Sequence, residues 1–224
     1  MIWWRGEVQY MELYIYGAGG NGKELFHILD KKGELAKFTK VTFIDKNKYG
    51  GELYGCPIVA LDEVLKRYDK EKFKVIISLG EPHLRLEILE ILRENGIEMY
   101  SNVEDARYYK AMGEGIVDWG CDTLADVTVG DACLLGTNAV IGHDTIIGEG
   151  THIGCNAFIG GNCVIGKGVL IGPGAVVRHN VKIGDNSSVG MGSIILKNIP
   201  ANSLVMEPST KVVLNGRTIS NFKA

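Results

Sequence analysis

Hydrophobic and polar positions repeat with a period of six through the second half of the chain. Twelve consecutive hexapeptides run from Val129 to Pro200, and every one of them begins with Val, Leu or Ile. Gly follows in ten units, the fourth position is Gly, Asn or Asp in eleven, and the fifth is small or β-branched in the first eleven. A repeat this short predicts one strand and one turn per unit, with successive units stacked into a solenoid.

Each position of the hexapeptide has a physical assignment. The aliphatic first residue points into a prism that is too narrow for a second large side chain, which accounts for the small fifth residue. Gly, Asn and Asp adopt positive φ at low cost, so the fourth residue is expected at a left-handed corner. Three units then close a triangular turn of 18 residues, and adjacent turns stack about 4.8 Å apart. The pattern resembles the left-handed parallel β-helix of hexapeptide-repeat acyltransferases.

The first hundred residues show a different pattern, in which short apolar runs alternate with amphipathic stretches. The runs predict strands at Glu12–Tyr16, Val41–Ile44 and Lys74–Leu79. The amphipathic stretches predict helices at Lys23–Lys32, Leu61–Tyr68 and Leu84–Asn95. Strands that alternate with helices indicate a small Rossmann-like parallel sheet. The expected fold class is therefore α/β plus all-β.

These patterns divide the chain into four segments. A Rossmann-like domain is expected over residues 11–100, a transition segment over 101–122, the β-helix over 123–211 and a C-terminal tail over 212–224. Residues 1–10 fit neither pattern, and Met11 is a possible natural start.

A glycine-rich segment follows the first predicted strand. Gly17–Gly22 fits the pattern GxGxxG and opens a helix, and Asp45 ends the next strand. This is the dinucleotide-binding fingerprint, in which amides at the start of a helix meet phosphate or sugar oxygens. A domain of about 100 residues is small for a nicotinamide site, so a nucleotide-linked substrate is favoured over a redox cofactor. A turn that only packs the helix onto the sheet is the third interpretation.

Composition limits the choice of partner and compartment. The 224 residues carry a net charge of −3, which favours neither nucleic acid nor a membrane surface. No apolar run is long enough to span a membrane, and Met1–Tyr10 lacks the features of a signal peptide. The five Cys residues show neither metal-binding nor disulfide spacing, which favours a reducing cytoplasm, and we expect no metal site.

Four stretches, taken together in their order and spacing, resemble one family. They are YIYGAGGNGKEL (Tyr14–Leu25), FIDKNK (Phe43–Lys48), VIISLGEPHLR (Val75–Arg85) and IGHDTIIGEGTHIG (Ile141–Gly154). The family is the sugar acyltransferases of the sialic acid O-acetyltransferase and bacillosamine N-acetyltransferase group. The resemblance covers roughly residues 11–211 and implies acetyl transfer from acetyl-CoA to an amine or hydroxyl of a sugar, commonly a nucleotide-linked one. It also implies a cytoplasmic homotrimer with active sites at subunit interfaces, and a role in surface glycan biosynthesis.

His143 is the candidate general base. It holds the outward third position of its unit, and a histidine suits proton transfer because its unperturbed pKa lies near neutrality. Asp144 stands at the corner, where Asp tolerates the left-handed turn, and the resemblance adds that its carboxylate orients His143. Gly161 follows His143 by one turn of 18 residues and so stacks on it. The resemblance implies that the Gly161 N–H holds the oxyanion.

The resemblance also implies contacts with both substrates. Positions that contact acetyl-CoA correspond to His152, Gly161, Pro173 and Met191. Positions that contact the nucleotide sugar correspond to Gly19, Gly20, Asn21, Asp45 and Lys46, with Gly80 beside the same loop. Asn21 replaces the histidine usual in the family, so the contact at that place differs. Arg85, in the first turn of the third predicted helix, either faces phosphate or is solvated.

The chain departs from the family after the repeats. Ile199 and Pro200 are present, but Met206–Lys211 replaces the family's Gly-Asn-Pro-Ala-Lys-like segment and keeps only its proline and lysine. The contacts at the adenine end of CoA, and with them the acyl donor, are therefore open.

The favoured function is an acetyl-CoA-dependent N-acetyltransferase acting on an amino-deoxy nucleotide-linked sugar. A sugar O-acetyltransferase is the main alternative, because the same base serves a hydroxyl acceptor. A non-catalytic nucleotide-sugar-binding subunit would not need His143. A γ-type carbonic anhydrase would use His143 and His179, two turns apart, but Gly184 stands where its third ligand is expected.

Overall fold

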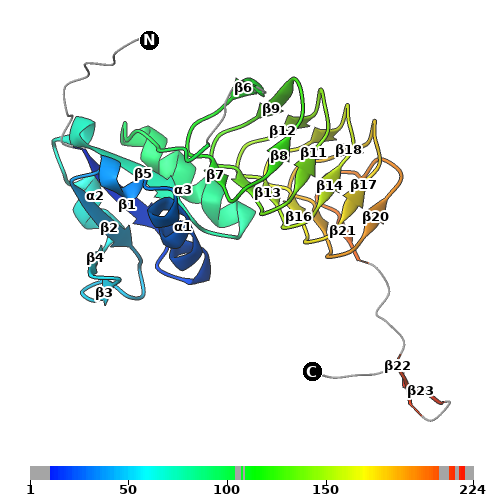
Figure 1. The fold of residues 1–224 in the computed structure, drawn as a ribbon, viewed down its shortest axis with the longest axis horizontal. Helices are drawn as coiled ribbons and strands as arrows, with labels where there is room; N and C mark the ends of the chain where they lie inside the picture. The colour runs from blue at the N-terminus through cyan, green and yellow to red at the C-terminus, as the bar shows by residue number, and fades with distance from the viewer. Residues whose placement is uncertain (1–10, 104–106, 108, 207–211, 215–216, 220–224) are drawn as a thin grey trace.

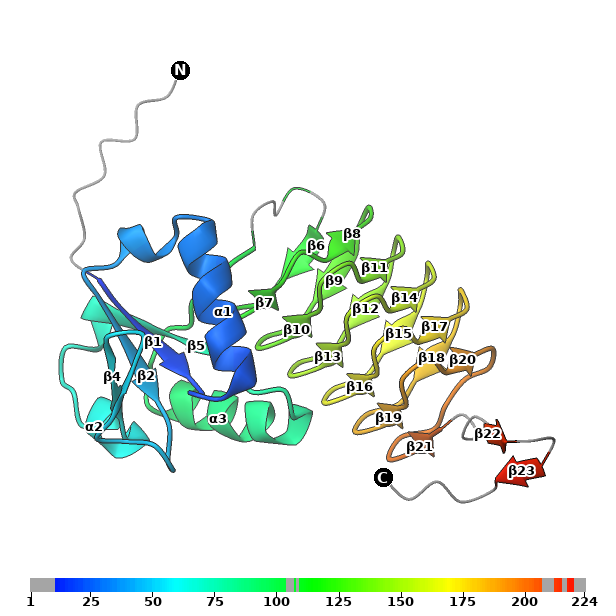
Figure 2. The same ribbon diagram turned by 60° about the horizontal axis from the view of Figure 1, so that its bottom comes forward.

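The fold has two parts, an α/β sheet and a long solenoid, which lie side by side along the molecule (Figures 1 and 2). The computed structural model describes residues 11–103, 107, 109–206, 212–214 and 217–219. Residues 1–10 and 207–211, on which the sequence analysis made separate predictions, lie outside the described residues.

The first part is built on a five-stranded sheet. Its strands are β1 (Glu12–Tyr16), β2 (Lys40–Ile44), β3 (Glu52–Leu53), β4 (Cys56–Val59) and β5 (Phe73–Ile77). The order is β3-β4-β2-β1-β5, with all neighbours parallel except β3 and β4. The sequence analysis did not predict the β3–β4 hairpin, because strands of two and four residues are too short to show a clear alternation. Its turn is formed by Tyr54 and Gly55, both at positive φ.

Helices cover both faces of this sheet. They are α1 (Gly20–Lys31), η1 (Leu35–Lys37), α2 (Leu61–Leu65), η2 (Lys70–Lys72) and α3 (Pro82–Glu94). Alternate residues of a strand point to opposite faces. Leu25 of α1 packs with Leu13 and Ile15 of β1, whereas Leu89 of α3 packs with Tyr14. The predicted small parallel α/β sheet is therefore confirmed, with α1 on one face and α3 on the other.

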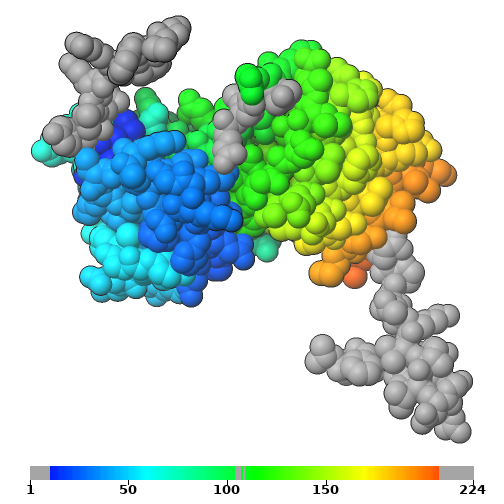
Figure 3. Space-filling view, viewed as in Figure 1, coloured from blue at the N-terminus to red at the C-terminus, as the bar shows by residue number. Residues whose placement is uncertain are grey.

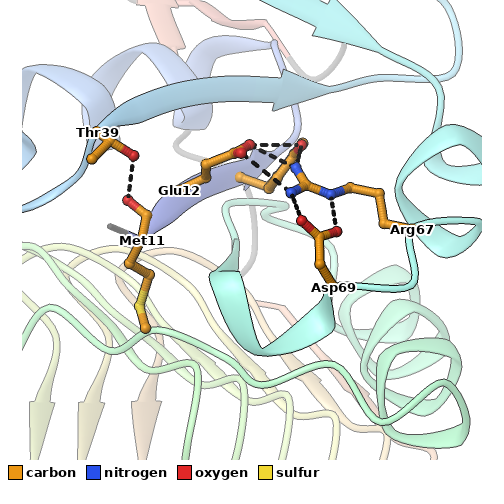
Figure 4. Close-up of polar contacts among 6 residues, drawn as sticks. Met11, Glu12, Thr39, Arg67 and Asp69 are labelled. Carbon is orange, nitrogen blue, oxygen red and sulfur yellow. Dashed lines mark hydrogen bonds and ion pairs between the residues drawn. The ribbon is translucent and has the colours of Figure 1, made fainter. Parts of the chain in front are cut away.

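An ion-pair network closes the amino-terminal edge of the sheet (Figure 4). Arg67 donates to Glu12 and to Asp69, with both N–O distances at 2.7 Å, and Thr39 Oγ1 donates to the carbonyl of Met11 at 3.2 Å. Burial acts to raise the pKa of Glu12, but hydrogen bonding to Arg67 and its positive charge lower it below its usual value. The network ties β1 to the segment that precedes β5.

The second part is a parallel β-helix whose three sheets form the faces of a triangular prism. The first face holds β7 (Val117–Asp118), β10 (Leu134–Leu135), β13 (His152–Ile153), β16 (Leu170–Ile171), β19 (Ser188–Val189) and β21 (Leu204–Val205). The second holds β8 (Asp122–Thr123), β11 (Val140–Ile141), β14 (Phe158–Ile159), β17 (Val176–Val177) and β20 (Ile194–Ile195). The third holds β6 (Tyr109–Met112), β9 (Val127–Val129), β12 (Ile146–Ile147), β15 (Val164–Ile165) and β18 (Lys182–Ile183). Beyond the prism, β22 (Val212–Leu214) pairs antiparallel with β23 (Arg217–Ile219).

The hexapeptide assignments are confirmed at nearly every unit. All twelve aliphatic first residues are buried in the prism, and so are the fifth residues of the first eleven units. The fourth residue has positive φ in the first eleven units, including Ala132 at 53°, which lacks the side chain predicted for that corner. The last turn differs, because Ile183 pairs with Ile199, only 16 residues later, and Asn202 takes the left-handed corner.

The solenoid begins earlier than its repeats. Residues 101–122, predicted as a transition segment, already contribute β6 and β7 to two faces of the prism. β6 pairs with β9 through a register irregularity between Tyr109 and Ala111. The spacing there is not that of a hexapeptide, so the sequence pattern does not reveal these strands.

The helix α3 joins the two parts at the corner between the third and first faces. Arg93 donates to Glu149 at 2.6 Å, and Leu86 lies where Gly150 and Gly168 leave room. A Cβ atom at Gly150 would lie 2.5 Å from Leu86 Cδ2. Figure 3 shows the two parts packed against each other. Within the described residues, no helix combines the length and the apolar character that a membrane span requires.

Candidate functional site

His143 and Asp144 form a hydrogen-bonded pair at the corner between the second and third faces. The distance from Nδ1 of His143 to Oδ2 of Asp144 is 2.7 Å, and both side chains are more than half exposed. The sequence folds this way locally because Asp144 adopts the left-handed corner, with φ of 57°. Its carboxylate accepts the hydrogen on Nδ1, so the lone pair of the neutral ring is on Nε2, which faces away from this partner.

Gly161 lies next to the ring of His143, one turn further along the prism. A Cβ atom at Gly161 would lie 2.6 Å from His143 Nε2 and less than 3 Å from two ring carbons. The predicted stacking of these two positions therefore brings together three predicted site residues: His143, Asp144 and Gly161.

The amide of Gly161 is open to a ligand for a reason that recurs along the prism. Ladder hydrogen bonds use other positions of the unit, and third-position amides donate to no partner within the described residues. The exceptions are Lys167, whose amide donates to Asp185 Oδ1, and Pro173, which has no N–H. The N–H of Gly161 is therefore available beside His143.

The glycine-rich loop after β1 contains glycines of two kinds. Gly17 has φ of +110°, and a Cβ atom at Gly22 would lie 1.9 Å from the carbonyl oxygen of Gly17, so both are needed by the fold. Gly19 and Gly20 are different, because a Cβ atom at either would meet no atom within 4 Å. Packing therefore explains only part of the motif and leaves open space over Gly19 and Gly20.

That space is a pocket of about 240 Å³ at the carboxyl edge of the sheet. Its lining includes Gly19, Gly20, Asn21, Asp45 and Gly80. Asp45 accepts hydrogen bonds from the amides of Ala18 at 3.0 Å and Asn47 at 2.9 Å, and so holds the loop in shape. The structure thus brings together five of the six residues predicted to contact a nucleotide sugar.

The sixth, Lys46, lines an adjoining pocket of about 330 Å³. Gly17, Asp45 and Leu79 line both pockets. The second pocket is mainly apolar, with Leu61, Leu84 and Ile88 among its lining residues. Sequence reasoning missed it because these side chains come from two helices whose apolar residues read as ordinary core.

His152 lies on the outer side of the first face, against the α/β domain. Its Nδ1 is 2.8 Å from the carbonyl oxygen of Gly80. Burial lowers the pKa of His152, and the nearby charge of Arg85 lowers it further although the Gly80 hydrogen bond opposes this. The neutral ring donates from Nδ1 to Gly80, which leaves Nε2 as its remaining polar atom. His152 and Gly80, predicted for different substrates, are therefore in direct contact.

Arg85 neither faces phosphate nor is solvated, so both interpretations of it were wrong. It is completely buried and donates to the carbonyl oxygens of Ile77 at 2.8 Å, Leu79 at 2.7 Å and Ala132 at 2.7 Å. The sequence held a signal for this, since Arg85 shares the helical stripe of Ile88, Leu89 and Leu92.

Pro173 and Met191 lie at a third place, the corner between the first and second faces. They stack in successive turns, and the amide of Gly192 donates to the carbonyl of Pro173 at 2.9 Å. Met191 is 76% exposed and borders an apolar groove of about 300 Å³ with Leu170 and Leu204.

The predicted site residues thus form three groups on one chain. His143 lies at the corner where the second and third faces meet, so the first face is on the opposite side of the triangular prism. His152 of the first face contacts Gly80, which lines the glycine-rich pocket. A single chain therefore does not bring His143 to the glycine-rich pocket.

No metal cluster accompanies these groups. The described residues contain no set of three or more His, Cys, Asp and Glu side chains placed to hold an ion. His179 stands two turns beyond His143 at the same corner, and Gly161 lies between them.

Two family models match the chain. The PglD N-terminal domain matches residues 12–92, and the bacterial transferase hexapeptide (six repeats) matches residues 126–161 and 162–197. No curated protein matches the chain.

Several solved structures share the fold over most of their length. The acetyltransferase domain of PglB from Neisseria gonorrhoeae in complex with acetyl coenzyme A is 24% identical, with 86% of this chain and 94% of that chain covered and a TM-score of 0.78. PerB from Caulobacter crescentus in complex with CoA and GDP-perosamine is 26% identical, with 86% and 92% covered and a TM-score of 0.76. WeeI from Acinetobacter baumannii is 23% identical, with 93% and 100% covered and a TM-score of 0.77.

The two matched models account for the two parts of the fold in their order along the chain. The predicted fold class and family resemblance are confirmed. The chain is a member of the hexapeptide-repeat transferases, and its own PglD N-terminal domain precedes its left-handed parallel β-helix.

Proposed function

We propose that the chain is an acetyl-CoA-dependent N-acetyltransferase that acts on an amino-deoxy sugar linked to a nucleoside diphosphate. One observation carries this proposal: the ring of His143 is held by Asp144 through Nδ1 and lies over Gly161, whose amide has no partner among the described residues. Two similar structures support the choice of substrates, since PglB contains acetyl-CoA, and PerB contains CoA and GDP-perosamine.

In the proposed reaction, the acceptor amine attacks the carbonyl carbon of the thioester while Nε2 of His143 removes a proton from the nitrogen. The negative charge that develops on the carbonyl oxygen is stabilised by the N–H of Gly161. When the intermediate collapses, the carbon–sulfur bond breaks and the thiolate of CoA takes the proton from His143. Asp144 keeps the ring oriented and stabilises its charged form, so no acyl-enzyme intermediate is required.

The nucleotide is assigned to the pocket over Gly19 and Gly20, within a domain of residues 11–100. The chain passes from β1 to β2 on one side and later returns to β5 on the other, so the sheet changes direction between β1 and β5. Ligands of open α/β sheets bind in the crevice at such a point, at the carboxyl ends of the strands. The amides at the start of α1 suit a phosphate, because no side chain caps them.

Acetyl-CoA is assigned to the corner of Pro173 and Met191. The apolar groove beside Met191 suits the uncharged arm of CoA. His152 has only Nε2 left for acetyl-CoA, because Gly80 occupies Nδ1.

A homotrimer is part of the proposal, because one chain separates the base from the nucleotide pocket. The two faces that meet at His143 carry outward apolar columns, with Phe158 and Ile194 on the second face and Ile146 on the third. These side chains are between 44% and 60% exposed. A neighbouring copy that covers them would bring its own nucleotide pocket or acetyl-CoA groove toward His143.

The test is thiol release from acetyl-CoA across a panel of UDP-, dTDP- and GDP-linked 4-amino sugars, with the acetylated product identified by mass spectrometry. We expect rapid release with one acceptor, and its loss in the His143→Ala variant. Retention of most of the activity by His143→Ala would contradict the assigned mechanism. Release with hydroxyl acceptors only would show a sugar O-acetyltransferase instead.

A further inference from the structure

Arg85 is the largest completely buried side chain in the described residues, and it is a cation without a carboxylate partner there. Its guanidinium is satisfied by carbonyl oxygens alone: those of Ile77 at the end of β5, of Leu79 two residues later, and of Ala132 in the solenoid, which accepts from both Nε and Nη2. Burial lowers its pKa to about 10, so the group is charged at neutral pH. A buried charge of this kind is costly, and an apolar side chain would suffice for packing alone.

The hydrogen bond to Leu79 fixes the direction of the next amide. All described peptide bonds are trans, and a trans peptide places its C=O and N–H on opposite sides. The N–H of Gly80 therefore points away from Arg85, and it has no partner within the described residues. Gly80 lines the pocket over the glycine-rich loop, whereas Arg85 does not.

Hydrogen bonds fix each of the residues from Ile77 to Gly80. Ser78 Oγ donates to the carbonyl of Tyr16 at 2.8 Å, Arg85 binds the carbonyls of Ile77 and Leu79, and His152 binds that of Gly80. Such support fixes the position of a peptide group before any ligand arrives, which lowers the cost of binding.

The pocket itself has little positive charge of its own. None of the described residues that line it is Lys or Arg, and Asp45 contributes a carboxylate. The start of α1 supplies a partial positive charge. Two cations lie next to the lining: Lys48, whose Nζ donates to the carbonyl of Ala18 at 2.9 Å, and Arg85. The charge of Arg85 lies behind Leu79 and Gly80 and acts through a poorly screened interior.

We propose that Arg85 is a positioning residue for the diphosphate of the substrate: it aims the N–H of Gly80 into the glycine-rich pocket and makes that pocket electropositive from behind. The inference rests on the proposed function, since it assumes that a nucleoside diphosphate occupies this pocket. Arg85 touches no substrate and takes no part in acetyl transfer.

The test measures binding of GDP, UDP and dTDP, and of guanosine, uridine and thymidine, to the full chain by calorimetry, with acetyl-CoA as an independent ligand. Arg85→Met removes the charge and all donors, and Arg85→Lys keeps the charge but reaches fewer carbonyls. Arg93→Met is the matched control, because Arg93 lies on the same helix and also binds the solenoid, but it contacts no carbonyl near Gly80. Thermal unfolding identifies any variant that does not fold.

We expect Arg85→Met to weaken binding of the preferred diphosphate by about tenfold or more. The corresponding nucleoside and acetyl-CoA should bind as before, Arg85→Lys should lose less, and Arg93→Met should lose nothing. If Arg85→Met does not fold, an intermediate loss in Arg85→Lys is the supporting result.

Two outcomes would overturn the inference while leaving the proposed function intact. One is that the wild type binds a diphosphate and the folded Arg85 variants bind it with the same affinity. The other is an equal loss in Arg93→Met, which would show that the effect comes from docking of the two parts. A wild-type chain that binds none of the three diphosphates would refute nucleotide binding itself.

Discussion

The imidazole of His143 rests on Gly161 in the next turn of the prism, at a distance that leaves no room for a side chain there. A Cβ atom at Gly161 would lie 2.6 Å from Nε2. One glycine therefore serves two purposes, because it admits the ring and presents beside it an amide that donates to no other described residue.

Gly161→Ala should displace the ring while the fold survives, since Gly161 is not among the glycines at positive φ. A misplacement of about 1 Å can cost on the order of a hundredfold in rate, so we expect kcat to fall by about ten- to a hundredfold. Gly51→Ala is the control, because its Cβ atom would make only an ordinary contact of 3.4 Å with Lys48 O. An unchanged kcat in Gly161→Ala would show that the ring position is unimportant.

Asp144→Asn separates the corner role of this residue from its role toward His143. Asn adopts the same left-handed corner at Asn156 and Asn162, so the fold should be unchanged. The carboxylate that orients and stabilises the ring is lost, and we expect kcat to fall by about tenfold or more. Asn138→Asp, the reverse change at another corner, should have no effect. Full activity in Asp144→Asn would show that Asp144 only forms the left-handed corner and does not support His143.

Gly20→Leu and Gly22→Ala should have opposite consequences. The first extends into empty space, so the melting temperature should hold while calorimetry shows loss of GDP and UDP binding. The second places a Cβ atom 1.9 Å from a backbone oxygen, and we expect destabilisation of about 1–3 kcal/mol or more in urea unfolding. Normal diphosphate binding by Gly20→Leu would place the ligand elsewhere.

Phe158→Glu tests the proposed trimer. A charge in the apolar column beside His143 should prevent neighbouring prisms from packing, so light scattering should report a monomer and acetyl transfer should be lost. Tyr68→Glu is the control, since Tyr68 is 96% exposed on the α/β part. An active monomer would show that one chain holds a complete site.

The Arg67 network should make stability depend on pH in the acidic range. Arg67 lowers the pKa of Glu12, whose ordinary value is 4.5, and hydrogen bonding to Arg67 likewise lowers the pKa of Asp69 from 3.8. Groups with a lowered folded pKa contribute stability above their unfolded pKa and lose it as the pH falls through the folded value. For the wild type, the urea concentration at the midpoint of unfolding should therefore decrease as the pH is lowered below about 5. Arg67→Met should have a lower midpoint at pH 7 and a flatter acid dependence, and parallel pH curves would refute the assignment.

Much of the fold was predictable because the repeat encodes it locally. Each hexapeptide specifies its own inward residue and its own corner, so Ile141 and Asn138 could be placed without knowledge of any distant contact. The glycine-rich loop was predictable for the same reason. The strands β6 and β7 could not be predicted, because they lack the hexapeptide spacing and form only by pairing with the first repeats of the prism.

The contacts between the two parts could not be predicted, since they depend on how separate periodic patterns meet. The spacing of the repeat predicts that His143 lies beside a corner, but nothing in it shows that His152 faces Gly80. Arg85 was missed through a general rule, because an arginine in the first turn of a helix is usually solvated. The stripe it shares with Leu89 and Leu92 shows its buried side, but the carbonyl oxygen of Ala132 that stabilises it comes from another part of the chain.

Third-position amides that donate to none of the described residues recur at each corner of the solenoid, so its backbone presents the same free donors turn after turn. A histidine moved by one or two turns along its corner would meet a backbone of the same shape, and His179 already stands at such a place. Whole turns can therefore be added to or removed from this scaffold without rebuilding the corner that holds His143. A different chemistry on this scaffold requires only different outward side chains at positions that stack on one another in successive turns.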